Sequence, residues 1–342
     1  MSDTTITVYK RDGQPLEDLS GSFVTRSWVL NRSGVATFTI PRGLSTLTEF
    51  NIRYGNPIVI QNDRVGIWGG FIWLPREHPF DGVKVWARSA EALLSRRRIT
   101  GVYATSGMSA GTMFASLIEL ANAKEDTLIR VDSIFSGGRI RSFKYANMLI
   151  GDAVVGLQKS TGIDWSIEPD ISTGRLIFLA QCYERRGRIW QFGLLEGKNI
   201  KLNLQPVLLE QGELVNDTIS VGLGATSAVT PYRAAADSAT NALYGLSEGL
   251  VQARGSSDAE LESAAAADLD KRKNPRRTYR ITAIDDDNTF DYLGLGDTLP
   301  LKLASYGLTA AGVGVEARVR VIAKEYSDLT GEMALTLDEV IT

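Results

Sequence analysis

Residues 291–303, DYLGLGDTLPLKL, decide the fold because they show how this chain enters its strands. A Gly-Leu-Gly-Asp turn leads into a segment in which Leu299, Leu301 and Leu303 alternate with other residues, the pattern of a strand with one apolar face. Two more strand patterns follow, at 317–326 and 332–340. No catalytic motif lies in or near the turn, so the sequence predicts a structural element here.

The first hundred residues are also dominated by strand patterns. The segment VATFTIP, at 35–41, places Ala36, Phe38 and Ile40 on one face and ends at a proline. The segment DGVKVWARS, at 81–89, alternates in the same way. Strands at this spacing, separated by Gly, Asn and Asp turns, predict a small β-barrel or sandwich.

The periodicity changes after residue 100. Residues 109–123 carry a broad apolar stripe at helical spacing, and a second helix is predicted over 146–162, ending at Gly162. Two strand patterns at 163–170 and 174–185 follow and predict a hairpin. Helix, helix and hairpin together form a compact α+β unit.

Two distant turns resemble each other. YGNPIVI at 54–60 and LGDTLPL at 295–301 each place Gly and then Asn or Asp before an alternating strand. We therefore expect a mainly β fold in which two small, similar β-barrels flank an α+β helix-hairpin insert. The predicted domains are a first barrel (1–100), the α+β insert (101–204), an irregular excursion or interface segment (205–255), and a helix plus second barrel (256–342).

Composition excludes several classes of protein. The 342 residues carry a formal net charge of −3, which gives no global electrostatic case for binding nucleic acid or a membrane surface. The single cysteine, Cys182, excludes an internal disulfide framework and any multi-cysteine metal site. No secretory signal is visible and no segment approaches about 18 consecutive apolar residues, so no membrane-spanning helix is expected.

Candidate chemistry is sparse. The only histidine, His78, is interpreted as a loop residue, and Cys182 has no nucleophile motif around it. The acidic run at 285–288 could offer oxygen ligands to calcium, although a solvated turn is the favoured interpretation. Basic runs at 95–98 and 271–277 are interpreted as helix-end or interface residues. We therefore name no catalytic, cofactor-binding or metal-binding residue, and we expect neither enzymatic activity nor a cofactor.

The order of elements resembles that of phage tail hub proteins, the baseplate hub or tail-tip family of long-tailed phages. The resemblance rests on SWVLNRSGVATFTIP at 27–41, on WGGFI at 68–72, and on a helix at 260–272 followed by the turn and strands quoted first. The middle segment, 151–180, resembles the helix-hairpin insert of that family.

The resemblance implies a structural virion protein of the tail tip, synthesised in the host cytoplasm. Hub subunits are typically homotrimers, so two barrels in each of three subunits match a hexameric tube. The expected partners are the tail tube or distal tail ring, other tail-tip or fibre proteins and the tape-measure protein, with DNA passing through the lumen without specific binding. Since the sequence ends at Thr342, directly after the last predicted strand, no appended hydrolase or fibre domain is expected.

Two other functions stay open from the sequence. One is a distal tail adaptor or a receptor- or carbohydrate-binding tail component. The other is a cell-wall hydrolase that uses paired carboxylates, which no sequence pattern can exclude because such pairing is spatial. The absence of a nucleophile motif, a histidine pair and a phosphate loop disfavours the hydrolase.

Overall fold

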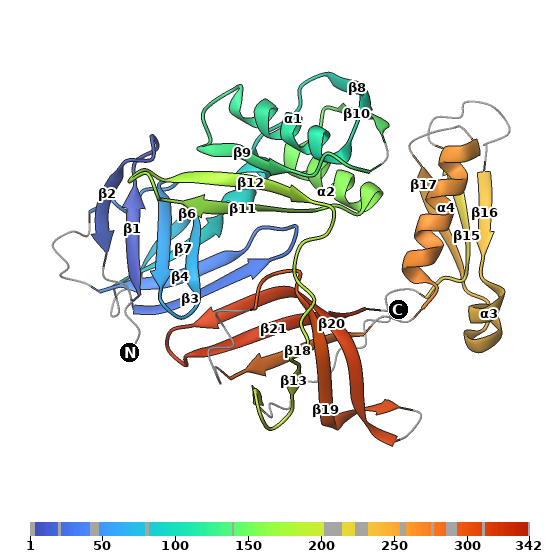
Figure 1. Ribbon diagram of the computed structural model, residues 1–342. Coiled ribbons are helices and arrows are strands. Elements are labelled where there is room, and N and C mark those ends of the chain that lie inside the picture. Colours follow the sequence, from blue (N-terminus) through green and yellow to red (C-terminus); the bar gives the residue numbers. More distant parts are fainter. Residues whose placement is uncertain are drawn as a thin grey trace.

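The structure is a computed structural model, shown as a ribbon in Figure 1. It describes residues 4–19, 22–41, 48–78, 82–138, 140–201, 214–222, 232–253, 258–274, 277–284, 293–309 and 312–340. Within these residues the fold is mainly β, as the sequence predicts, and none of the described helices is long and apolar enough to cross a membrane.

The N-terminal strands form one end of a large sheet. They are β1 (Thr5–Tyr9), β2 (Pro15–Leu19), β3 (Ser22–Val29), β4 (Val35–Ile40), β5 (Pro57–Asn62), β6 (Gly66–His78) and β7 (Gly82–Ser89). Alternation decides which side chains are buried: Ala36, Phe38 and Ile40 of β4 are at most 1% exposed, whereas the residues between them are half-buried. The strand predictions at 35–40 and 83–89 are confirmed.

The insert packs one helix on a small sheet and a second helix beside the first. Its elements are η1 (Ala90–Arg96), β8 (Val102–Met108), α1 (Ala110–Asn122), β9 (Ile129–Ile134), β10 (Arg141–Ala146), α2 (Ile150–Thr161), β11 (Asp164–Asp170) and β12 (Ile177–Tyr183). The predicted hairpin is the antiparallel pair β11–β12, and β9 joins β12 in parallel. Met113, Phe114 and Leu117 of α1 belong to the same apolar core as Trp165 and Phe178 of this sheet.

The strands of the second half complete the large sheet, and the last of them, after residue 298, are drawn in red in Figure 1. They are β13 (Leu194–Leu195), β14 (Ile200–Lys201), β18 (Thr278–Ala283), β19 (Thr298–Thr309), β20 (Gly312–Ser327) and β21 (Glu332–Glu339). Strand β20 is long enough to change partner: residues 312–320 pair with β19, and residues 323–327 pair with β3 of the first half. The two ends of the chain therefore share one 13-stranded sheet.

The described strands do not form two separate closed barrels. Their order runs from β14 through β18, β21, β20, β3, β4, β7, β6, β5 and β1 to β2, with β13 and β19 attached beside β20. The sheet is open in this part of the chain because the pairing of β20 with β3 fuses the two halves. Apolar side chains still divide into separate clusters for the N-terminal strands and the C-terminal strands.

The two halves nevertheless share a strand order. The first half has the strand order β3-β4-β7-β6-β5-β1. The second half has the strand order β14-β18-β21-β20-β19-β13. The first five members of each run pair antiparallel, whereas β1 is antiparallel to β5 and β13 is parallel to β19. In each run the register shifts where the third and fourth members pair, after Ile72 and after Val321.

The two similar turns before β5 and β19 adopt the same backbone geometry. Gly55 and Gly296 have φ values of +83° and +86°, a left-handed conformation that favours glycine. In each turn the backbone N–H of the glycine donates a hydrogen bond to the carbonyl oxygen of the residue just before the register shift. The backbone N–H of that same residue donates a hydrogen bond to the carbonyl oxygen of the residue after the glycine. These hydrogen bonds are Gly55 N to Ile72 O (2.8 Å), Ile72 N to Asn56 O (2.9 Å), Gly296 N to Val321 O (2.7 Å) and Val321 N to Asp297 O (2.8 Å).

The region expected to be irregular, 205–255, contains regular elements. Its described residues form β15 (Asp217–Gly222), β16 (Tyr232–Ala236), α3 (Ser238–Tyr244) and β17 (Glu248–Ala253). These strands form a sheet of order β16-β15-β17, on which α4 (Asp258–Arg272) packs, and Figure 1 shows this unit beside the main body. The prediction was wrong because the strands are short and rich in Ala, Ser and Gly, which gives little hydrophobic alternation.

Candidate functional site: the junction of the two halves and the insert

The side chains considered from the sequence do not assemble into a reactive site. His78 is the last residue of β6 and not a loop residue, because its backbone pairs with Gly82 of β7. Cys182 is 2% exposed within the core of the insert, and burial raises the pKa of its thiol to about 11. The acidic run at 285–288 lies outside the described residues. In the described part of the chain no three His, Cys, Asp or Glu residues lie close enough together to hold a metal ion.

The basic runs take structural positions. In the first run Arg97 forms an ion pair of 2.7 Å with Glu125. In the second, Arg272 pairs with Asp268 one turn earlier on α4, and Lys273 lies 2.9 Å from Asp270. The helix-end interpretation of residues 272 and 273 is therefore confirmed, whereas residues 275–276 lie outside the described residues.

A buried polar network lies where the insert meets both halves, around Asp164 at the start of β11. Asp164 is 2% exposed. Its Oδ1 accepts a hydrogen bond of 2.9 Å from Asn31, and its Oδ2 accepts one of 2.7 Å from the backbone N–H of Arg186. The guanidinium of Arg320, on β20, also donates to Oδ2. One carboxylate thus joins the first half, the insert and the second half.

A second buried carboxylate, Asp297 in the turn before β19, organises the chain that leaves the insert. Its Oδ1 accepts from the backbone N–H of Arg188, and its Oδ2 accepts from the indole N–H of Trp190, both at 2.7 Å. The backbones also approach closely here, because a Cβ on Gly296 would lie 2.4 Å from the carbonyl oxygen of Arg186. The turn quoted first from the sequence is therefore the docking point for residues 186–190.

A fully buried arginine closes the joint between β3 and β20. Arg26 is 0% exposed and lies 3.3 Å from Asp328. Its guanidinium carbon is 5.4 Å from the ring centroid of Tyr326 and 5.9 Å from that of Trp28. Burial lowers the pKa of Arg26, while Asp328 raises it. Removing one partner of such a pair leaves an uncompensated buried charge.

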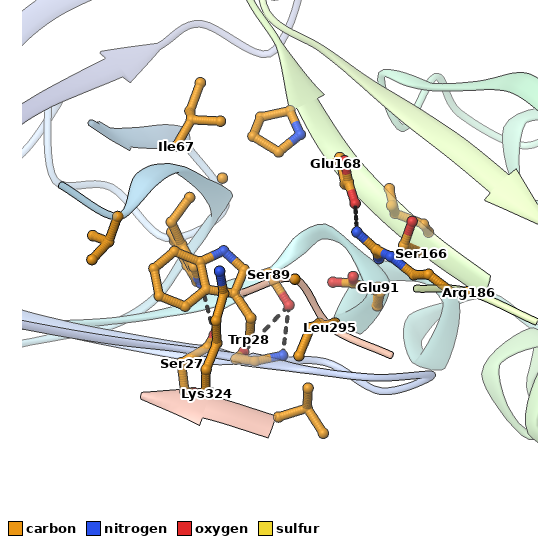
Figure 2. A pocket seen from close by; sticks show the side chains of 18 residues that line it. Ser27, Trp28, Ile67, Ser89, Glu91, Ser166, Glu168, Arg186, Leu295 and Lys324 are labelled. Atoms are coloured by element: carbon orange, nitrogen blue, oxygen red, sulfur yellow. Dashed lines mark hydrogen bonds and ion pairs between the residues drawn. The ribbon is translucent and has the colours of Figure 1, made fainter. Parts of the chain in front are cut away.

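A cavity of about 210 Å³ lies beside this joint and is shown in Figure 2. Glu168 and Arg186 form an ion pair on its wall. Lys324 lies 4.9 Å from the ring centroid of Trp28, and its ammonium donates a hydrogen bond of 3.2 Å to the carbonyl oxygen of Leu293. Glu91 also lines the cavity, and its Oε2 is buried without a hydrogen-bond partner.

Burial shifts the pKa values of Glu91 and Lys324 in the direction that favours the neutral form of each side chain. It raises the pKa of Glu91 to about 7, against hydrogen bonds from Ser89 and the backbone of Glu91 and Ile167 that lower it. It lowers the pKa of Lys324 to about 8, helped by the charge of Arg186. The ion pair of Glu168 with Arg186 and the contacts of Lys324 with Trp28 and Leu293 hold three parts of the fold together around the cavity.

Spatial proximity, and not sequence pattern, assembles this junction. Asn31, Asp164, Arg186 and Arg320 lie apart in the sequence, and no sequence pattern pairs them with one another. The one sequence signal is the Asp of the Gly-Leu-Gly-Asp turn, a pattern that by itself predicts only the start of a strand.

Comparisons with known proteins identify the fold. No protein-family model matches the chain, and no curated protein matches its sequence. Among solved structures, it is similar to the 43 kDa tail protein of prophage MuSo2 from Shewanella oneidensis, with a TM-score of 0.66 and 11% identity over 99% of this chain and 98% of that one. It is also similar to a tail protein from Neisseria meningitidis MC58, with a TM-score of 0.66 and 13% identity over 98% and 96% of the two chains.

A third structure agrees. Prophage tail protein gp18 from Listeria monocytogenes EGD-e matches with a TM-score of 0.60 and 12% identity over 98% of this chain and 94% of that one. All three matches run through both halves and the insert, so the resemblance predicted from short motifs is confirmed at the level of the fold. The chain has the fold of phage tail proteins.

Proposed function

We propose that this protein is a structural tail hub that forms a trimeric ring at the distal end of a phage tail. In this proposal the ring joins the tail tube to tail-tip components and leaves a channel for DNA. The regions at 1–100 and 256–342 supply the two similar halves of the sheet to the ring, and the insert lies between them in the chain. The protein works by assembly and not by catalysis.

The repeated strand order is the observation that carries the proposal. Two halves that share five antiparallel strands and one turn geometry offer two similar positions per chain. Three copies would offer six, which allows a threefold ring to meet a sixfold tube. Heterologous contacts of this kind form closed rings when the rotation between copies closes.

The chemistry of the junction supports an assembly role. Its carboxylates and guanidinium groups are used in contacts within the chain. A formal net charge of −3 also suits a channel that does not retain DNA, because DNA affinity depends on counterion release by Lys and Arg.

Antibody labelling of intact particles tests the location. Gold-labelled antibody against the purified protein is expected at the tail tip of particles from a producing strain. Label on the capsid, along the whole tail or only in the soluble lysate would contradict the proposal.

A further inference from the structure

A group of aromatic and arginine side chains lies at the surface where the register of β6 shifts. We call it the β6 patch: Tyr54, Trp73, Arg88 and Arg96. The rings of Tyr54 and Trp73 lie 5.9 Å apart, and the guanidinium carbon of Arg96 lies 4.7 Å and 4.8 Å from their centroids. Arg88 lies 5.2 Å from Trp73.

The patch has the composition of a protein interface. Tyr54 is 39% exposed, and both arginines are exposed. Neither arginine forms an ion pair with a described residue. Tyr, Trp and Arg are the residue types enriched at the energetic centres of protein interfaces.

The same place in the second half is covered. By the shared register, Trp73 corresponds to Ile322, since each follows the residue at the shift. The carbonyl oxygen of Ile322 accepts a hydrogen bond of 2.9 Å from Leu30 at the end of β3. From there β3 runs along β20 as an antiparallel partner, so the first half covers this surface of the second half.

The covered joint also has the chemistry of the exposed patch. Within it, Arg26 lies between Trp28 and Tyr326, and Lys324 lies over Trp28. An arginine–aromatic cluster is thus buried where the halves meet inside the chain, and a similar cluster stays exposed where the repeat has no second neighbour.

Among the described residues, two strand edges lack the partner that the repeat predicts. Residues 74–78 of β6 correspond to the part of β20 that pairs with β3, yet in the described part they pair only with β7. Strand β14 pairs with β18 in the second half as β3 pairs with β4 in the first half, so β14 corresponds to β3. Among the described strands it pairs with β18 alone, and a single bridge links Ile200 to Glu196. Unpaired edges are templates for strands of another chain.

We propose that the β6 patch and the adjoining edge of β6 bind the β14–β18 edge of a second copy of this chain, repeating between copies the contact that β3 makes with β20 within one copy. This inference rests on the proposed ring and names its contact surfaces. The contact is head-to-tail: each copy uses its β6 patch toward one neighbour and its β14 edge toward the other. Such a contact closes a ring without a twofold axis.

Charge reversal tests the patch. Arg96→Glu is expected to raise, at least about tenfold, the protein concentration at which half of the chains are assembled, because it removes a cation that lies over two interface rings and adds a like charge to any carboxylate opposite. The control is Arg98→Glu, an exposed arginine of the same basic run that lies outside the patch. Equal assembly of wild type and Arg96→Glu, with both folded by thermal melting, would overturn the role of the patch.

Crosslinking tests the pair of edges directly. His78→Cys protein mixed with Lys201→Cys protein, treated with a flexible bismaleimide crosslinker, is expected to give a crosslinked dimer that neither variant gives alone. The native thiol of Cys182 is buried and contributes little background. The control mixture pairs Lys201→Cys with Lys159→Cys, an exposed position on α2.

The outcomes separate the two proposals. A wild-type ring of three copies without the specific crosslink would overturn the contact surfaces and leave the ring intact. Crosslinking within either single variant would overturn the head-to-tail geometry. A wild-type protein that never assembles would overturn the proposed ring and this inference together.

Discussion

Arg320 of the C-terminal sheet donates a hydrogen bond to the buried carboxylate of Asp164 in the insert. The same carboxylate accepts from Asn31 of the first half, so a single side chain links parts of the chain that are 133 and 156 residues apart in sequence. The fold therefore depends on a charge that is only 2% exposed.

Removing this charge is expected to destabilise the protein. Asp164→Ala leaves the Arg320 guanidinium without its carboxylate and should cost about 3–5 kcal/mol, the usual range for breaking a buried ion pair. Thermal and urea unfolding measure the loss. Asp126→Ala is the matched control, since its ion pair with Arg130 is exposed and such pairs contribute about 0.2–1 kcal/mol. Equal losses in the two variants would contradict the central position of Asp164.

A side chain at Gly296 should be poorly tolerated. In Gly296→Ala the new Cβ would lie 2.4 Å from the carbonyl oxygen of Arg186, in a backbone conformation with φ +86°. Gly174→Ala is the control, because Gly174 also has positive φ, at +78°, but its Cβ would meet nothing within 4 Å. The control should lose about 1–2 kcal/mol from conformation alone. Gly296→Ala should lose clearly more, measured as apparent melting temperature and soluble yield.

Stability should fall between about pH 5 and pH 7 because of Glu91. Its folded-state pKa, about 7, exceeds the ordinary value of 4.5, so the folded protein binds its proton more tightly than the unfolded chain. The stabilisation by protonated Glu91 is fully present below the pKa of Glu91 in the unfolded chain. It is lost as the pH rises through the pKa of Glu91 in the folded protein, and the free energy of unfolding falls by on the order of 3 kcal/mol. Lys324, with a pKa lowered to about 8, adds a pH dependence chiefly above this window.

Glu91→Gln isolates that effect. The neutral amide keeps the size of the side chain but does not titrate, so the melting temperature of this variant should change less than that of the wild type between pH 5 and pH 7. Parallel pH profiles for the two proteins would show that Glu91 does not bind its proton more tightly in the folded state.

Cys182 should react slowly in the native protein. Its thiol is 2% exposed, and burial raises its pKa to about 11, so the reactive thiolate is scarce at neutral pH. Labelling with a maleimide should be slow in buffer and complete in denaturant. Rapid labelling of the native protein would contradict the packing of β12 in the insert.

Sequence periodicity predicted the strands and helices that bury a continuous apolar face, such as β4, β7, α1 and α2. It also identified the echo of Gly55-Asn56 with Gly296-Asp297, because a left-handed glycine before a strand is a local feature. The partner change of β20 and the Asp164 network depend on residues far apart in the sequence, for which a single sequence carries no pairing information. Helix α4 was predicted, whereas the three-stranded sheet beneath it was not, because Thr218 and Ser220, which lie under α4, are polar and replace the usual apolar stripe.

The most direct test of the account is the mass of the purified protein in solution, measured by native mass spectrometry and accompanied by electron micrographs of the particles. We expect closed rings with three times the chain mass of 37.3 kDa and six similar lobes around a channel. A protein that remains monomeric at all concentrations, or a ring of six chains, would contradict it.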